Sequence, residues 1–598
     1  MHLSILPLLA LATSSCAFPA LFGRSSMRKT SELFDTRIAE SLAYPPNGWE
    51  LDENAVLDKD TSMIKLRIHL EQQGMSDFQD LAMKIATPGH ELYGSHLPQH
   101  AINAMIAPKD ESRDLVMNWL DKMGVKSQAS MAPRGDAILV EASVADVEKL
   151  LGAEYSVFER TGYGETVIRT LEYSLPKVLK GHVSFVQPTT FFGLRTMRST
   201  ISEVKPVSLD TESVNAVEAV TGCSGSTITP TCLANLYNLT SSTSTQTAGL
   251  MGVAGFLQEY ASKSDLTTFM SKYKYFSNGA DTYTCTAVNS GSCPTSPSSP
   301  GAEANLDVQY ARALTKDIPN VYYSTGGSPP WLGTGTNTNE PYLEFLDYFL
   351  ALDSASLPNT LSISYGDDES TVPLYYATEV CNLFSQLGAR GVSVLVAAGD
   401  SGVGTSCTSG STKTFTTSFP AGCPWVTTVG GTTGNTPEKA WTDGGGGFSE
   451  IFGRPSYQDS VVSTWLSTDT THSGVTSYFN SSGRAYPDIA AQATNFVIVI
   501  SGSAVAVTGT SCSTPTFASL VQLLNSDRIA SGKSGLGFLN PWLYSTGSSG
   551  LTDITSGSIT GCSGVISGAG FSAVSGWDPA TGLGTPNYGK LLALSQAT

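Results

Sequence analysis

The sequence predicts an α/β fold built on a parallel sheet, preceded by a smaller α+β domain. Residues 360–365 and 391–398 are apolar runs with several β-branched side chains, which is typical of buried strands. Residues 372–387 between them have the apolar spacing of a helix. A strand, a helix and a strand in this order indicate parallel strands joined by a right-handed crossover. The first 200 residues instead alternate short strand and helix patterns.

The N-terminus has the pattern of a secretory signal peptide over residues 1–17. Its apolar run, residues 3–12, is too short to span a bilayer, and small residues follow at a suitable cleavage site. A membrane anchor is the alternative. Because no later run approaches about 20 apolar residues, we expect a secreted, extracellular protein without a membrane partner. Sequons at Asn238 and Asn480 then predict glycosylation.

The charge of the 598-residue chain divides it into two regions. The formal net charge is -18, yet about 20 of the 34 Lys and Arg residues precede residue 200. We therefore expect one domain over residues 18–200 and another over residues 201–598. The acidic surface repels nucleic acid, so we expect no such partner. A chain with few bases suits acidic surroundings, because it gains less positive charge when its carboxylates protonate.

Residues 18–200 are expected to fold as the smaller domain. In chain order the patterns indicate a strand at 63–70, a capped helix at 76–83, a helix at 112–123, a strand at 136–142 and a helix at 143–151. The basic stretch 195–200 indicates an exposed processing linker. Two interpretations remain: a folding helper and inhibitor of a downstream protease, or an independent binding domain.

Ten cysteines in a secreted chain indicate disulfides. Two pairs are close enough in loop-like sequence to close small loops: Cys223 with Cys232, and Cys285 with Cys293. Besides these and Cys16 in the signal, five cysteines remain, an odd number, so we expect one free thiol. Cys512 is the candidate, because it lies beside Ser511 in a strand-to-helix turn.

Residues 302–314 predict a helix that carries two carboxylates on one side. Its apolar face consists of Leu306, Tyr310 and Ala313. Glu303 and Asp307 are four residues apart and therefore neighbours on the helix. Two ionised carboxylates there repel, so one pKa should rise and the pair can share a proton. The alternative is a solvated acidic first turn, which the helix dipole favours.

Asp400 and Ser511 are each expected just beyond a strand. Asp400 follows the strand at 391–398, and Ser511 lies between the apolar run 495–500 and a helical pattern that starts at 516. Ligands of parallel sheets bind beyond the carboxyl ends of the strands, so both side chains are expected on one edge. A Ser before a helix can be a nucleophile near the positive helix end or simply a cap.

The histidines argue against a Ser-His-Asp site. Six of the seven precede residue 200, and only His472 follows it, in a Ser/Thr-rich run without apolar residues to hold it. If Ser511 is a nucleophile, its base is therefore expected to be a carboxylate.

Three motifs in this order resemble the signatures of the sedolisins, the serine-carboxyl peptidases. They are Gly-Ala-Glu-Ala-Asn-Leu-Asp at 301–307, Ala-Gly-Asp-Ser-Gly at 398–402, and Gly-Thr-Ser-Cys-Ser-Thr-Pro at 509–515. Residues 419–432 also resemble the family, and residues 30–190 resemble its activation prodomain. The resemblance implies a subtilisin-like catalytic domain over residues 201–598, similar to those of secreted fungal tripeptidyl-peptidases.

The resemblance also implies a role for each candidate residue. Ser511 would be the nucleophile, and Glu303 would take its proton and return it to the leaving amine. Asp307 would orient Glu303. Asp400, kept protonated, would donate a hydrogen bond to the oxyanion, which only a neutral carboxylic acid can do. A Glu base works at lower pH than a His, because it stays ionised there.

A second site is implied near the C-terminus, where two segments resemble the calcium loop of the family. Asp553 and Asp578 would supply carboxylate oxygens, and Ile554 and Gly576 would supply carbonyls, with Val574 as a further candidate. Such hard oxygen ligands suit Ca²⁺. Without the resemblance, these are ordinary turn residues. Cys562 lies in this loop and could bond Cys407, just after Asp400.

The resemblance implies a zymogen whose prodomain inhibits it intramolecularly and whose substrates are peptides and proteins. We expect a monomeric, acid-active tripeptidyl-peptidase. A sedolisin-type endopeptidase is the alternative, because the motifs are shared. A catalytically silent binding protein is a third, against which the intact candidate residues argue.

Overall fold

The computed structural model describes residues 30–598 with short gaps, which are 47–48, 133, 161–165, 191, 193–197, 200, 202, 207–222, 224–226, 240–246, 277–280, 327–340, 406 and 410–411. The predicted signal peptide, most of the predicted linker at 195–200 and part of the Asn238 sequon lie outside the described residues. Among the helices it describes, none combines the length and apolarity needed to span a bilayer.

The N-terminal part is an α+β domain, as predicted. A four-stranded antiparallel sheet has the order β4, β5, β3, β9. Its strands are β4 (Ala129–Met131), β5 (Ala137–Ser143), β3 (Met63–Leu70) and β9 (Val183–Gln187). Helices α3 (Asp110–Lys122) and α4 (Val144–Leu151) share one apolar core with this sheet. The other strands form smaller antiparallel sheets: β1 (Thr36–Ser41) with β8 (Glu172–Pro176), and β2 (Trp49–Leu51), β6 (Tyr155–Arg160) and β7 (Thr166–Thr170) together.

Helix α1 (Met75–Ala86) begins near the position predicted, but its cap is different. The residue before it is Gly74, in the left-handed conformation with φ 62°, and no side chain caps the helix. A Cβ at Gly74 would lie 2.7 Å from the Met105 carbonyl oxygen. The close approach of this backbone therefore favours glycine, where the sequence suggested a serine cap.

The C-terminal part is built on a parallel sheet of the predicted kind. Its order is β13, β14, β12, β15, β17, β21, β22, and β25 pairs with β21. Every neighbouring pair is parallel except β21 and β22. The strands are β13 (Thr284–Val288), β14 (Asn320–Thr325), β12 (Met251–Gly255), β15 (Thr360–Ile363), β17 (Ser393–Ala397), β21 (Thr427–Thr433), β22 (Lys439–Ala440) and β25 (Ile489–Gln492).

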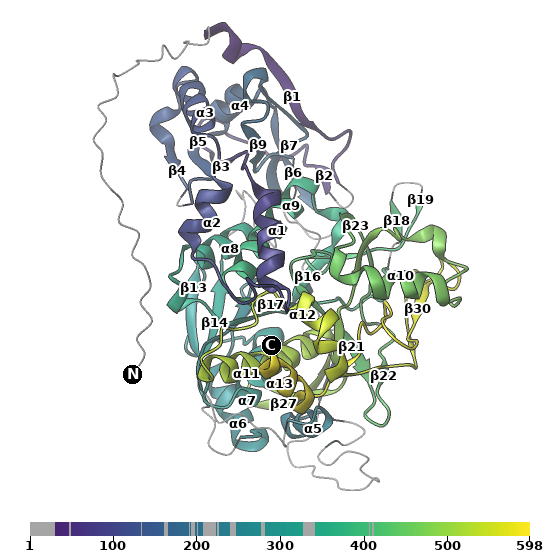
Figure 1. The fold of residues 1–598 in the computed structure, drawn as a ribbon. Coiled ribbons are helices and arrows are strands. Elements are labelled where there is room, and N and C mark those ends of the chain that lie inside the picture. The colour runs from purple at the N-terminus through teal and green to yellow at the C-terminus, as the bar shows by residue number, and fades with distance from the viewer. Residues whose placement is uncertain are drawn as a thin grey trace, which may run out of the picture.

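Helices cover both faces of this sheet (Figure 1). One face packs against α6 (Lys263–Tyr273), α7 (Ala302–Leu314), α11 (Thr510–Ala530) and α13 (Tyr588–Ala597). The other packs against α8 (Tyr342–Ala351) and α9 (Leu374–Ala389). Neighbouring strands come from distant segments of the chain, and helices cover both faces of the sheet. The architecture is therefore an α/β sheet covered on both sides.

The N-terminal domain packs against the second face. Buried residues of α1 and α2 (Gln99–Ile106) belong to the same apolar core as α8 and α9, and Figure 1 shows α1 lying beside α9. Phe78 and Ile102 have no exposed surface in this core. The two domains are therefore joined by a buried apolar interface.

The segment before Ser511 differs from the prediction. Strands β26 (Phe496–Ile500) and β27 (Ser503–Thr508) form an antiparallel hairpin, and β11 (Glu203–Pro206) pairs with β27. These strands are outside the parallel sheet. Helix α11 begins at Thr510 and not near 516, and it contains Pro515. Its first turn consists of small polar residues, so apolar spacing could not reveal it.

The cysteine predictions are confirmed. Disulfides join Cys223 to Cys232, Cys285 to Cys293 and Cys407 to Cys562. A fourth bond, which spacing left open, joins Cys381 in α9 to Cys423. Among the described residues Cys512 is the free cysteine, and it is buried.

Candidate active site

Ser511 lies in the first turn of α11 and has no exposed surface. Its Oγ lies 3.5 Å from the carbonyl oxygen of Ser364. Ser364 follows β15, at the carboxyl end of a central strand of the parallel sheet. Ser511, the predicted nucleophile, thus lies at the predicted edge of the sheet. The strand that precedes it, however, belongs to the β26–β27 hairpin and not to the parallel sheet.

Glu303 and Asp307 lie in α7 and are 1% and 0% exposed. The alternative, a solvated acidic first turn, is therefore wrong. The two carboxyl groups are hydrogen-bonded to each other, and Ser364 Oγ donates to Asp307 Oδ1 at 2.8 Å. Burial raises the pKa of Asp307 well above its usual value. A carboxyl pair of this kind holds a proton between its members.

Asp400 lies just after β17 and reaches the first residue of α11. The backbone N–H and the hydroxyl of Thr510 both donate to Asp400 Oδ1, each at 2.8 Å. Burial raises the pKa of Asp400 to about 8, in spite of these two hydrogen bonds. The carboxyl group is therefore protonated at acidic and neutral pH, and Oδ2, which has no partner among the described residues, can carry the proton.

The three carboxyl groups lie near Cys512, the residue next to Ser511. Burial raises the pKa of the Cys512 thiol, and the negative charges of Glu303, Asp400 and Asp307 raise it further. Helix α11 packs along α7, which brings the two motifs together. One hydroxyl, one carboxyl pair and one neutral acid in a buried site can transfer a proton and stabilise an oxyanion.

Ser364 is the residue of this site that sequence reasoning missed. It connects the parts, because its hydroxyl donates to Asp307 and its carbonyl lies near the Ser511 hydroxyl. The only signal for it was its position: it directly follows the strand at 360–363. A serine at that point carries no motif of its own in a chain so rich in serine.

His472 is not part of this arrangement, but the reason given from the sequence was wrong. Its ring is held by apolar surroundings after all: it stacks on Trp465 with 4.2 Å between ring centroids. Its Nδ1 lies 3.0 Å from Asp469 Oδ2. Trp465 belongs to an apolar core of the C-terminal segment that is separate from the core around α7 and α11.

The predicted metal residues lie around one loop. Asp553 Oδ2 accepts the backbone N–H of Gly576 at 2.8 Å, and Asp578 Oδ2 accepts that of Val574 at 2.9 Å. Asp578 is fully buried, and burial raises its pKa to about 7. A buried carboxylate of this kind is stabilised by a cation.

The donor set around this loop fits a hard cation. In the described part of the chain no hydrogen bond reaches the carbonyl oxygens of Ile554, Val574 or Gly576. Free carbonyls and two carboxylates are the ligands that Ca²⁺ prefers. Over the same residues, however, no cluster of three or more His, Cys, Asp or Glu side chains is arranged to hold a metal. A cation here would therefore depend on carbonyl oxygens.

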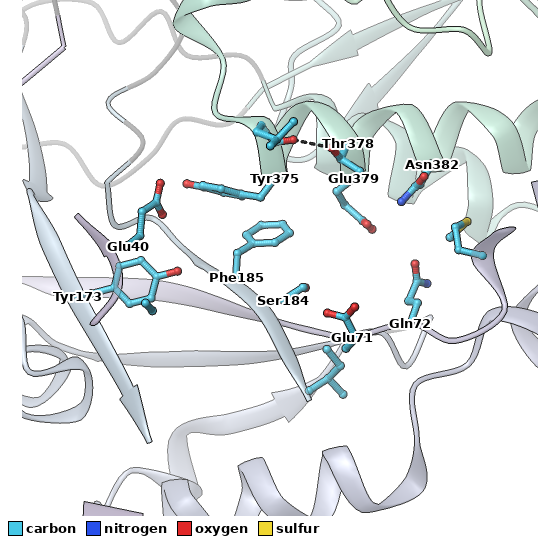
Figure 2. A pocket seen from close by; sticks show the side chains of 14 residues that line it. Glu40, Glu71, Gln72, Tyr173, Ser184, Phe185, Tyr375, Thr378, Glu379 and Asn382 are labelled. Atoms are coloured by element: carbon cyan, nitrogen blue, oxygen red, sulfur yellow. Dashed lines mark hydrogen bonds between the residues drawn. The ribbon is translucent and has the colours of Figure 1, made fainter. Parts of the chain in front are cut away.

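A cavity of about 490 Å³ lies between the N-terminal domain and α9, away from the candidate residues (Figure 2). Glu40, Tyr173 and Phe185 line it from the N-terminal side, facing Tyr375 and Glu379 of α9. None of its lining residues is Glu303, Asp307, Asp400 or Ser511. The cavity belongs to the interface between the domains.

A segment that follows the N-terminal domain pairs with the strand beside the site. β10 (Arg198–Ser199) is antiparallel to β16 (Tyr365–Asp368), with Ser199 opposite Tyr365. Tyr365 directly follows Ser364. The chain's own backbone therefore occupies a strand edge that an extended peptide could use.

Family models match both parts of the chain. Residues 48–192 match the Pro-kumamolisin activation domain, and residues 352–533 match the subtilase family. Tripeptidyl-peptidase SED2 of Arthroderma otae is 37% identical over 599 residues, which is 96% of this chain and 98% of that protein. Tripeptidyl-peptidase SED4 of the same organism is 37% identical over 580 residues, 94% of each chain.

The chain belongs to the sedolisin family of serine peptidases. This sedolisin consists of an activation domain and a subtilisin-like catalytic domain. A solved structure of Pseudomonas sedolisin, a serine-carboxyl proteinase complexed with two molecules of pseudo-iodotyrostatin, is 21% identical, covers 63% of this chain and 100% of its own, and has a TM-score of 0.49.

Proposed function

We propose that this sedolisin is a secreted, acid-active tripeptidyl-peptidase that releases tripeptides from free N-termini of peptides and proteins. The observation that carries the proposal is the near full-length identity to proteins named tripeptidyl-peptidase. The convergence of Glu303, Asp307 and Asp400 around the first turn of α11 supports a serine-carboxyl mechanism.

In this mechanism the Ser511 hydroxyl attacks the scissile carbonyl carbon, and Glu303 takes the hydroxyl proton. Asp307 holds the carboxyl group of Glu303 by a hydrogen bond and is itself held by Ser364. When the tetrahedral intermediate collapses, Glu303 returns the proton to the leaving amine. Water then hydrolyses the acyl-enzyme by the same proton transfers, and the tripeptide leaves with a new carboxylate.

Asp400 stabilises the oxyanion. It donates a proton in a hydrogen bond to the oxygen that becomes negative, which requires the neutral acid. The pKa of about 8, raised by burial, keeps that acid neutral over the whole acidic range. The two donors from Thr510 fix Oδ1 and leave Oδ2 to carry the proton.

We divide the chain into a signal peptide (1–17), an activation prodomain (18–200) and the peptidase domain (201–598). The prodomain inhibits the enzyme intramolecularly until it is cleaved. This role is supported by the activation-domain match over 48–192 and by the pairing of β10 with β16. Secretion agrees with the four disulfides, and Asn238 and Asn480 would be glycosylated.

One structural Ca²⁺ is proposed near the C-terminus. Asp553 and Asp578 would bind it through carboxylates, and Ile554 and Gly576, with Val574 beside them, through carbonyls. The ion would neutralise two carboxylates and order the loop; it takes no part in the reaction. We further propose that the mature enzyme is a monomer and has no nucleic-acid or membrane partner.

The deciding experiment is a product map at acidic pH. The mature enzyme is given one peptide with a free N-terminus and the same peptide with an acetylated N-terminus, and products are identified by mass. Tripeptides released in order from the free peptide alone support the proposal. Internal cleavage of the acetylated peptide would establish the endopeptidase instead. No cleavage of either, by a processed and folded protein, would leave the silent binding protein.

A further inference from the structure

The loop that follows strand β12 contacts the N-terminus of α7, the helix that carries Glu303 and Asp307. Residues 256–262 connect β12 to α6. The Gly301 N–H donates to the Tyr260 carbonyl at 3.1 Å, and the Tyr322 hydroxyl donates to the Glu259 carbonyl at 2.7 Å. The backbone of this loop is thus fixed both to the start of α7 and to β14.

The side chain of Glu259 lies at the N-terminus of α7. The N-cap residue of this helix is Gly301, which has no side chain. The N-cap position therefore makes no side-chain hydrogen bond to the first turn. Instead, the Glu259 carboxylate lies beside the first turn of α7, near the backbone N–H groups of Ala304 and Glu303. These are two of the N–H groups that a helix leaves without an internal partner, and a negative charge at this end is favoured by the helix dipole.

Two backbone features show that this contact is tightly built. A Cβ at position 301 would lie 1.6 Å from Glu259 Oε2, so any residue other than glycine would displace the carboxylate. Leu257 and Gln258 both have positive φ, 55° and 57°. Consecutive non-glycine residues rarely adopt this conformation, and each costs of order 1 kcal/mol. These two unfavourable backbone conformations directly precede Glu259, the residue whose side chain lies beside α7.

The carboxylate of Glu259 also acts on the pair by its charge when it is ionised, and burial raises the pKa of Glu259 itself. Burial is the main cause of the raised pKa of Asp307, and the negative charge of Glu259 raises it further. The other titratable groups around Glu259 are Glu303, Tyr322 and Tyr365. The tyrosines stay neutral at acidic pH because burial raises their pKa values.

We infer that Glu259 is a positioning residue of the serine-carboxyl reaction: it fixes the first turn of α7, and so the Glu303 carboxyl group. Two effects of its side chain are separable. The first turn needs an oxygen acceptor beside it, which glutamine also provides. The charge needs a carboxylate. This inference rests on the proposed roles of Glu303 and Asp307.

The test compares Glu259→Gln and Glu259→Ala in the mature enzyme on a peptide with a free N-terminus that is longer than three residues. We expect Glu259→Ala to lower kcat about 10- to 100-fold with little change in KM, because the first turn loses its acceptor. Glu259→Gln should restore most of kcat but move the pH optimum of kcat/KM lower by about half a unit to one unit, because a neighbouring negative charge is gone. Asp281→Asn, at an exposed acid, is the charge control.

An unchanged pH optimum in Glu259→Gln, or equal kcat in Glu259→Ala and the parent, would overturn the inference. Melting temperatures show whether Glu259→Ala folds; if it does not, Glu259→Gln alone decides through the pH profile. Glu303→Gln is measured in parallel. If Glu303→Gln keeps full activity, the proposed mechanism fails; if it is inactive while both Glu259 variants match the parent, only the role of Glu259 fails.

Discussion

The guanidinium of Arg134 lies 2.8 Å from the carboxylate of Asp347, so an ion pair joins the activation domain to the catalytic domain. Arg134 also contacts Asp136, and Arg67 lies 2.6 Å from Asp347. The Arg134 side chain is only 6% exposed. Ion pairs removed from water in this way are costly to break, because each leaves an uncompensated charge.

We predict that Arg134→Ala weakens the docking of the activation domain. Breaking a buried pair by removing one partner costs about 3–5 kcal/mol, so conversion of the zymogen at acidic pH should be at least about tenfold faster. The rate is measured by gel electrophoresis after a pH drop. Arg113→Ala, at an exposed pair with Asp114, is the control and should convert at the parental rate. Equal rates for all three proteins would contradict a restraining role for Arg134.

Ser511→Ala should abolish peptidase activity, by at least about a thousandfold, and leave the activation domain attached. The physical reason is the loss of the only nucleophile in the proposed mechanism. Ser531→Ala, at the exposed C-terminal end of the same helix, is the matched control and should process normally. Normal turnover by folded Ser511→Ala would refute the assignment of Ser511.

The pKa of Asp400 predicts an upper pH limit for peptidase activity. Its neutral form is required, and burial raises its pKa to about 8. The active fraction should therefore fall about tenfold for each pH unit above that value, in addition to any earlier loss from the carboxyl pair. Asp400→Asn keeps a donor whose proton does not titrate. Its activity at acidic pH should be lower by about 10²–10³-fold, without the loss near pH 8. A maximum at clearly alkaline pH in the parent would contradict the mechanism.

Chelation should lower the melting temperature of the mature enzyme and leave the catalytic groups in place. An ion that binds only the folded state at 100 times its Kd stabilises it by about 2.7 kcal/mol. The pKa of Asp578 without metal is about 7, so calcium competes with a proton and its effect should shrink as pH falls below 7.

Asp578→Asn should melt as the chelated parent does, and Asp353→Asn, at an exposed acid, should remain sensitive to chelator. Identical melting curves with and without chelator, together with metal analysis that finds no calcium, would remove the ion from this proposal.

The sequence predicted the fold well where side-chain periodicity reflects burial. The strands around β15 and β17 and the helix α7 lie within two or three residues of their predicted bounds. It failed at the first turn of α11, because Thr510 and Ser511 are held by contacts with Asp400 and Ser364 that are distant in the sequence. It failed for His472 for the same reason: its apolar partner Trp465 belongs to a separate helix, α10 (Asp459–Thr468).

Only part of the candidate site could be predicted from the sequence. Motifs revealed Glu303, Asp307, Asp400 and Ser511 as residues, but not that Ser364 links two of them. Glu259 was equally hidden, since it lies beside a helix that begins over 40 residues later, and single acidic residues in loops carry no sequence signal.

The pairing of β10 with β16 makes occupancy of that strand edge exclusive. A tethered segment has an effective local concentration in the millimolar range when its tether is short. A free peptide at micromolar concentration therefore competes with it only if it binds about a thousandfold more tightly. If the tether is cut and the activation domain leaves, as proposed, the same segment is diluted into bulk solution and its advantage disappears. In the proposed maturation, cleavage of one covalent bond would sharply lower the effective concentration of this internal competitor, and external substrate would gain access without any change in the site itself.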